Sequence, residues 1–211
     1  FPVGESNTVF VGPKIENYYM HGTTPSIYKP VLKAFTLGGN GAAYGASTDT
    51  GAGWAYKADN GFAVSSNIGT KSKTTQKDAD DNYIESGLLT DESKTSWATQ
   101  IGLTKEQYSV SAMVNMKYNG WSDSYFTAGS AQTGNTTNYG LRAWWRPLET
   151  GTATPQVSFG YDYTTIADVA DSVDSTDAYF VGLNWLDTFN ADDRIGIAFG
   201  QPQTREDNTA D

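Results

Sequence analysis

Basic side chains recur at intervals that would place them on one face of an extended chain. Arg142 and Arg146 lie four residues apart, so both would project from the same side of a β-strand. The residues that we expect on this side are Lys57, Lys117, Arg142, Arg146 and Arg194, with Asp162 as the acid among them. A row of such cations would attract anions or orient polar solutes through charge-assisted hydrogen bonds. The alternative is that each arginine pairs with a neighbouring carboxylate and serves stability.

Carboxylates gather in two further stretches of the chain. The first holds Asp78, Asp80, Asp81 and Glu85, and the second holds Asp168, Asp171, Asp174 and Asp177. Several carboxylate oxygens suit a hard divalent cation, but neither stretch has the spacing of an EF-hand loop. A solvated loop surface is therefore the simpler interpretation of both, with cation binding by the first stretch as the alternative.

Residues for other kinds of chemistry are scarce. The chain has no cysteine and a single histidine, His21, which excludes thiolate sites and any site with two histidines. No GxSxG, P-loop or Rossmann fingerprint is present, so we expect neither an enzyme nor a cofactor, and no role for His21. The net charge of −10 and the pI near 4.4 argue against nucleic acid as a partner.

The charged residues fall within segments of roughly ten residues that alternate apolar with polar or small residues, as in membrane barrels. We predict nine strands, over residues 8–15, 51–57, 61–69, 95–103, 107–118, 138–146, 155–163, 177–186 and 194–201. The connections 70–94, 119–137 and 164–176 are long and polar, whereas those between them are short and rich in turn residues. All long connections would therefore emerge at one end of a meandering sheet.

The alternation separates an apolar face from a polar one. Tyr and Trp collect near the ends of the segments on the apolar face, which suits a lipid-facing wall with aromatic girdles. The polar face would line water. The alternative is a soluble antiparallel sandwich, in which the same period arises from one face on a core. No run approaches the twenty apolar residues of a membrane-spanning helix.

The stretch 16–50 is too long for a turn. Pro30 and the Gly38-Gly39 pair bracket a short predicted helix. We expect that this stretch folds into the channel and narrows it, with Tyr28, Val31, Leu32 and Phe35 as the constricting residues. The alternative is a surface lid packed on neighbouring loops.

The second half of the chain resembles a known family. The quoted segments are Leu141-Arg-Ala-Trp-Trp-Arg-Pro-Leu-Glu-Thr-Gly-Thr-Ala-Thr-Pro155, Gly160-Tyr-Asp162, Tyr179-Phe-Val-Gly-Leu-Asn-Trp185 and Asp193-Arg-Ile-Gly-Ile-Ala-Phe-Gly-Gln-Pro202. They are similar to the cyanobacterial outer-membrane porins, which are related to the carbohydrate-selective OprB porins and are also called iron uptake porins. The resemblance covers about a third of the chain, from about Tyr139 to Pro202, and is only a general pattern before Gly51.

This resemblance implies a homotrimeric porin in the cyanobacterial outer membrane, in contact with its lipid. It implies passage of small solutes: inorganic ions, iron or sugars. It also implies an S-layer-homology domain that binds peptidoglycan and that this chain lacks. The whole chain, residues 1–211, would be one incomplete all-β domain, an antiparallel up-and-down transmembrane β-barrel with about nine strands of a larger barrel. Nine is an odd number and the outer strands would need partners, so we expect further strands.

Three function classes remain open from the sequence. The first is a diffusion porin, which we favour. The second is a soluble or surface carbohydrate-binding protein, in which Trp54, Trp121 and Trp144 would be exposed and stack on sugar rings. The third is a structural anchor of the envelope. The first predicts conductance, and the second predicts a monomer that stays in solution without detergent.

Overall fold

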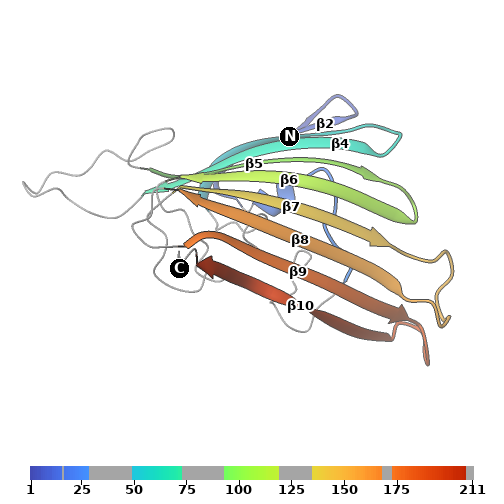
Figure 1. Cartoon of the computed structure of the whole chain (residues 1–211). Coiled ribbons are helices and arrows are strands. Elements are labelled where there is room, and N and C mark those ends of the chain that lie inside the picture. Colours follow the sequence, from blue (N-terminus) through green and yellow to red (C-terminus); the bar gives the residue numbers. More distant parts are fainter. Residues whose placement is uncertain (16, 29–48, 73–92, 119–134, 168–172, 208–211) are drawn as a thin grey trace, which may run out of the picture.

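The fold is a single antiparallel meander of ten strands. The computed structural model describes residues 1–15, 17–28, 49–72, 93–118, 135–167 and 173–207 (Figure 1). Every strand pairs with the next one in the sequence, in the order β1 to β10. The strands are β1 (Pro2–Val3), β2 (Asn7–Ile15), β3 (Asp49–Lys57), β4 (Phe62–Ser72), β5 (Ser93–Thr104), β6 (Tyr108–Tyr118), β7 (Asn135–Trp145), β8 (Gln156–Ala167), β9 (Val173–Leu186) and β10 (Arg194–Asp207).

One short helical element accompanies the sheet. The 3-10 helix η1 (Asn17–Met20) follows β2, and no α-helix occurs among the described residues. None of the described helical segments has the length and apolar character needed to span a membrane. The architecture is therefore all-β, as the alternation predicted.

All nine predicted strands form, but several details differ from the prediction, and β10 continues to Asp207, six residues beyond its predicted end. Pro2 and Val3 add a tenth strand, β1, by pairing with Thr8 and Asn7. β8 and β9 also extend into the predicted loop 164–176, where Thr165 pairs with Ser175. β-branched residues favour such continued pairing. Asp174 of the second acidic stretch consequently lies within β9, as does Asp177, which pairs with Tyr163.

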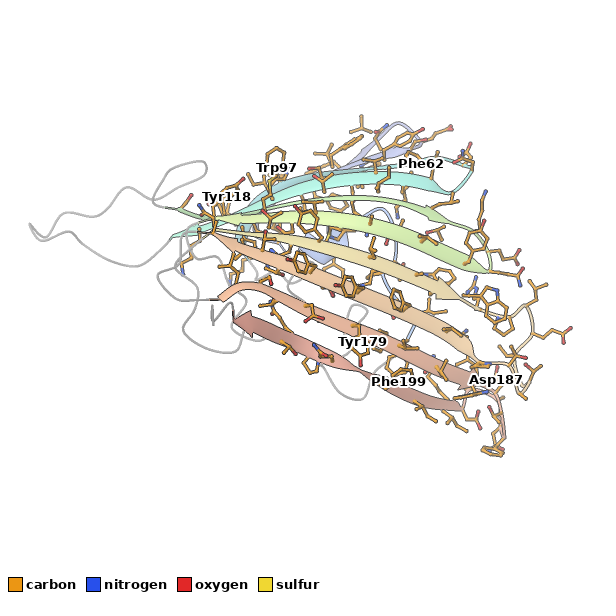
Figure 2. All side chains as sticks on the ribbon, in the orientation of Figure 1. Phe62, Trp97, Tyr118, Tyr179, Asp187 and Phe199 are labelled. Carbon is orange, nitrogen blue, oxygen red and sulfur yellow. The ribbon has the colours of Figure 1, made fainter. Side chains whose placement is uncertain are left out.

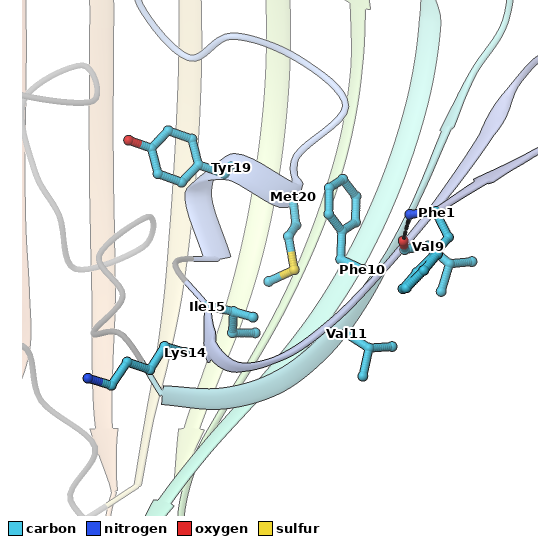
Figure 3. Close-up of a pocket in the computed structure, with 8 residues that line it drawn as sticks. All are labelled: Phe1, Val9, Phe10, Val11, Lys14, Ile15, Tyr19 and Met20. Atoms are coloured by element: carbon cyan, nitrogen blue, oxygen red, sulfur yellow. Dashed lines mark hydrogen bonds between the residues drawn. The ribbon is translucent and has the colours of Figure 1, made fainter.

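The sheet is open within the described residues. β1 and β10 lie at opposite edges and do not pair with each other. β1 pairs with only two residues of β2, so most of the outer edge of β2 lacks a strand partner among the described residues. A hollow of about 320 Å³ lies beside this edge, where Met20 of η1 approaches Phe10 (Figure 3).

Short turns close one end of the sheet. Residues 58–61, 105–107, 146–155 and 187–193 connect successive strand pairs there (Figure 1). Gly61 has a φ of +86°, and a Cβ at this position would collide with the carbonyl oxygen of Thr104. Asp187 and Asp192 adopt left-handed backbone angles, which Asp tolerates better than most residues. The predicted alternation of short and long connections holds as far as β8, whereas the connection between β8 and β9, predicted to be long, spans only residues 168–172.

The two faces of the sheet differ in chemistry as predicted. On the outer face, large apolar side chains are exposed; Ile101, Leu141 and Ile197 are each at least half exposed. Figure 2 shows Phe62, Trp97, Tyr118, Tyr179 and Phe199 on this face. The inner face buries polar side chains: Ser65, Asn67, Gln100, Ser109, Ser111, Asn115, Lys117, Arg142, Ser158, Asp162 and Asn184. This is the reverse of a water-soluble sheet, which buries its apolar face.

Candidate functional site

A segment that begins at Met20, the last residue of η1, crosses the inner face of the sheet. We call residues 20–28 the strap. In Figure 1 the strap passes behind the central strands. The inner face of the sheet, which we call the wall, holds the backbone of the strap mainly through polar side chains of β4, β5, β7, β8 and β9. The amide N–H groups of Gly22, Thr23 and Tyr28 donate to Ser65 Oγ (3.1 Å), Gln100 Oε1 (3.0 Å) and Ser158 Oγ (3.1 Å). The carbonyl oxygens of Thr24 and Ile27 accept from Trp144 Nε1 (3.0 Å) and Asn184 Nδ2 (3.5 Å).

The side chains of the strap alternate in burial. His21, Thr23 and Pro25 are buried against the wall, whereas Thr24 is exposed and Ser26 is partly exposed. Pro25 restricts the backbone of Thr24, because the helical region is disfavoured for the residue before a proline. The strap therefore has one side that packs on the sheet, the wall side, and one exposed side, the free side.

Glycines of the inner face make room for the strap. A Cβ at Gly53 would lie 2.9 Å from the Sδ of Met20, and a Cβ at Gly102 would lie 2.7 Å from the Cγ2 of Thr23. A Cβ at Gly182 would lie 2.7 Å from the ring of Tyr28. Glycine in a strand commonly marks close approach of another segment. The small residues of the polar face are thus part of the strap's binding surface.

His21 is the only titratable side chain of the strap besides Tyr28. Its Nδ1 lies 3.4 Å from Ser65 Oγ, and the residue is only 7% exposed. Burial lowers the pKa of His21 to about 4, so the ring is neutral at pH 7. The sequence assigned no role to this residue, whereas the structure places its ring on the wall side of the strap, against Ser65 of β4.

Arg142 and Asp162 form a buried ion pair on the inner face. Nη2 of Arg142 lies 2.9 and 2.8 Å from the two carboxylate oxygens of Asp162, and both side chains are almost completely buried. Nη1 of Arg142 donates to the carbonyl oxygens of Leu141 and Tyr161. This geometry is the paired alternative that the sequence left open for the arginines.

The other predicted cations lie at different levels of the wall. Lys117 is buried near the end of β6 that leads into a long connection. Lys57, Arg146 and Arg194 are exposed at the turn end. Nε of Arg146 donates to the carbonyl oxygen of Glu106 (2.7 Å), and its guanidinium lies 5.7 Å from the ring centre of Trp144. The structure therefore places these cations at both ends of the strands, with the Arg142 pair between them.

Amides and hydroxyls form a connected row across β5 to β8 on the inner face. Ser96 Oγ donates to Asn115 Oδ1 (2.9 Å), and Asn138 Nδ2 donates to the carbonyl oxygen of Asn115 (3.1 Å). Thr164 Oγ1 donates to Asn138 Oδ1 (2.8 Å). All four side chains are buried, and these bonds satisfy polar groups that would otherwise destabilise the sheet.

Other predicted site residues have separate outcomes. Tyr28 lies on the inner face, with its ring centre 5.3 Å from that of Phe180. Trp144 was expected to be exposed, and this expectation is wrong, because its ring is buried beneath the strap. Trp54 is 40% exposed on the outer face. The residues outside the described part of the chain are Val31, Leu32, Phe35, Asp78, Asp80, Asp81, Glu85, Trp121, Asp168 and Asp171.

Sequence reasoning missed most of the strap. Its wall contacts join residues that are 43 to 157 positions apart. A signal was present in the glycines of the polar face, which the strap covers. Within the described ranges, no three His, Asp or Glu side chains are grouped as metal ligands. No protein-family model and no curated protein matches this chain.

Proposed function

We propose that this chain forms part of the wall of an outer-membrane porin, a water-filled channel for passive diffusion of small solutes. The observation that carries the proposal is the reversed burial of the sheet, with apolar side chains exposed on one face and polar side chains buried on the other. Lipid accepts an apolar outer face, and a lumen accepts a polar inner one. Bulk water on the outer face would leave a large apolar area exposed, which soluble monomers avoid.

Aromatic side chains on the outer face support the same proposal. Tyr108, Trp145 and Trp185 lie near the turn end, whereas Tyr118 and Tyr179 lie farther along the strands. Tyr108 and Tyr118 are ten residues apart, which corresponds to about 34 Å along β6 and, at the strand tilt of roughly 35–45° in such barrels, to a height of about 26 Å. The apolar band of outer-membrane barrels is roughly 25 Å tall between its aromatic girdles. Such rings settle at the boundary between lipid and water.

The open edges add a requirement. Backbone groups without partners are too costly in lipid, so the porin proposal needs further strands beside β2 and β10. By the resemblance to cyanobacterial porins, we further propose a homotrimer in the outer membrane whose solutes are inorganic ions, iron or sugars. Attachment to peptidoglycan would require a domain outside this chain.

Planar-bilayer recording of the complete protein tests the proposal. Discrete conductance steps with a linear current–voltage relation would support a diffusion porin, and the reversal potential under a salt gradient would give its ion preference. Protein unfolded before addition is the control. A silent bilayer with verified insertion would instead favour an envelope anchor, and a detergent-free monomer in solution would favour the carbohydrate-binding alternative.

A further inference from the structure

The free side of the strap carries no charge at neutral pH. The strap sequence from Met20 to Tyr28 contains no Lys, Arg, Asp or Glu, and His21 is neutral because burial lowers its pKa. The exposed side chain on the free side is Thr24, followed by the partly exposed Ser26. Both offer a hydroxyl that can donate and accept hydrogen bonds.

The wall holds Thr24 in one orientation. The carbonyl oxygen of Thr24 accepts from Trp144 Nε1, the amide of the preceding Thr23 donates to Gln100, and Pro25 restricts the backbone that follows. The backbone of Thr24 therefore faces the wall through its carbonyl, while its side chain is exposed. A residue fixed in this way presents the same group to every passing solute.

The described charges differ in how close they come to this position. Arg142 is paired with Asp162 beneath the inner surface. Lys57, Arg146 and Arg194 lie at the turn end of the strands. Arg146 nevertheless comes close to the strap, because its guanidinium lies 5.7 Å from the ring centre of Trp144, whose Nε1 donates to the carbonyl oxygen of Thr24.

From these observations we infer that the strap is the solute-contacting surface of the channel and that Thr24 is a specificity-determining residue. Discrimination at Thr24 acts through size and through hydrogen bonding to its hydroxyl. This inference rests on the proposed porin function and names the side chain that solutes meet.

Cysteine substitution tests the inference, because the chain contains no cysteine of its own. We compare Thr24→Cys with Thr23→Cys, which changes the same residue type one position earlier, on the wall side. Each complete variant is treated with a cationic (trimethylammonium) or an anionic (sulfonate) methanethiosulfonate reagent. Labelling is followed by mass, and single-channel conductance and reversal potential are recorded. Thr150→Cys, exposed in the turn 146–155, controls for effects of labelling itself.

We expect Thr24→Cys to be labelled, and we expect labelling to lower its single-channel conductance. The two reagents should shift its reversal potential in opposite directions, because a fixed charge at a narrow, low-dielectric point controls ion selectivity. Thr23→Cys should resist labelling, and labelled Thr150→Cys should conduct like the unmodified protein.

Two results would overturn the inference while leaving the porin proposal intact. One is equal labelling of Thr23→Cys and Thr24→Cys, and the other is labelled Thr24→Cys with unchanged conductance and reversal potential. If the unmodified protein forms no channels, the porin proposal fails, and the role of Thr24 in solute passage fails with it. The difference in labelling between Thr23→Cys and Thr24→Cys, measured by mass, still decides which side of the strap is exposed.

Discussion

Arg142 and Asp162, on the neighbouring strands β7 and β8, bind each other through two hydrogen bonds of 2.9 and 2.8 Å while almost fully buried. Removing one partner would leave the other charge buried without compensation. We expect Arg142→Ala to lower the free energy of unfolding by roughly 3–5 kcal/mol. Denaturant unfolding of the refolded protein, followed by tryptophan fluorescence, measures this loss.

A double variant separates pairing from mere packing. Arg142→Met with Asp162→Leu removes both charges and should be more stable than Arg142→Ala alone. Arg146→Ala, at an exposed position, serves as the matched control and should cost no more than about 1 kcal/mol. If the double variant is as unstable as the single one, the ion pair does not explain the destabilisation.

His21 should make stability depend on pH in a defined window. Above the ordinary pKa of 6.5, His21 is neutral in both the folded and the unfolded state. Between pH 6.5 and about 4, only the unfolded state takes up the proton, so the free energy of unfolding falls as the pH falls. At roughly 1.4 kcal/mol per pKa unit, the total loss is about 3 kcal/mol.

The measurement is the unfolding free energy of the protein and of His21→Gln between pH 4 and pH 7. The variant should have the shallower slope, because its glutamine does not titrate and the carboxylates contribute equally to both proteins. Parallel slopes would show that His21 is not held neutral against β4.

Gly182 should be needed beneath the strap. A Cβ there would lie 2.7 Å from the ring of Tyr28 and 2.5 Å from the Cζ of Phe180, so Gly182→Ala forces both rings to move. Overpacking of this kind costs about 1–3 kcal/mol. Combining Gly182→Ala with Tyr28→Ala should cost less than the sum of the two single changes, as measured by denaturant unfolding. Strict additivity would mean that the two residues are not in contact.

Asp193 should hold the turn between β9 and β10. Its carboxylate accepts the backbone N–H groups of Asn190, Phe189 and Thr188, which lowers the pKa of Asp193. These bonds are complete above the ordinary pKa of 3.8 and weaken as the pH falls through the lower folded pKa. We expect Asp193→Ala to increase proteolytic cleavage within residues 187–193 at neutral pH.

Asp192→Gly is the matched control for this turn. Glycine adopts the φ of 68° found at Asp192 without strain, so cleavage should stay at the level of the unmodified protein. Equal resistance of Asp193→Ala and Asp192→Gly to protease would show that the carboxylate of Asp193 does not stabilise the turn.

The strands and their two faces were determined by the sequence itself. Side chains alternate within a strand, so a period of two residues states which of them share a face regardless of the rest of the molecule. The polar positions Ser65, Gln100 and Asn115 were assigned to one face and are buried together there. The turn at residues 58–60 was equally readable from its Asp and Asn residues, whereas the contact of Gly61 with Thr104 of the next hairpin was not.

Only the tertiary structure decided what lies on the inner face. Arg142 meets Asp162, and Trp144 is buried rather than exposed, because strand register and the path of the strap bring distant residues together. The strap contacts β4 and β9 through residues as far as 157 positions away, and no local period encodes such pairs. The sequence thus determined the strands and the two faces of the sheet, whereas long-range packing decided which groups of the inner face stay exposed.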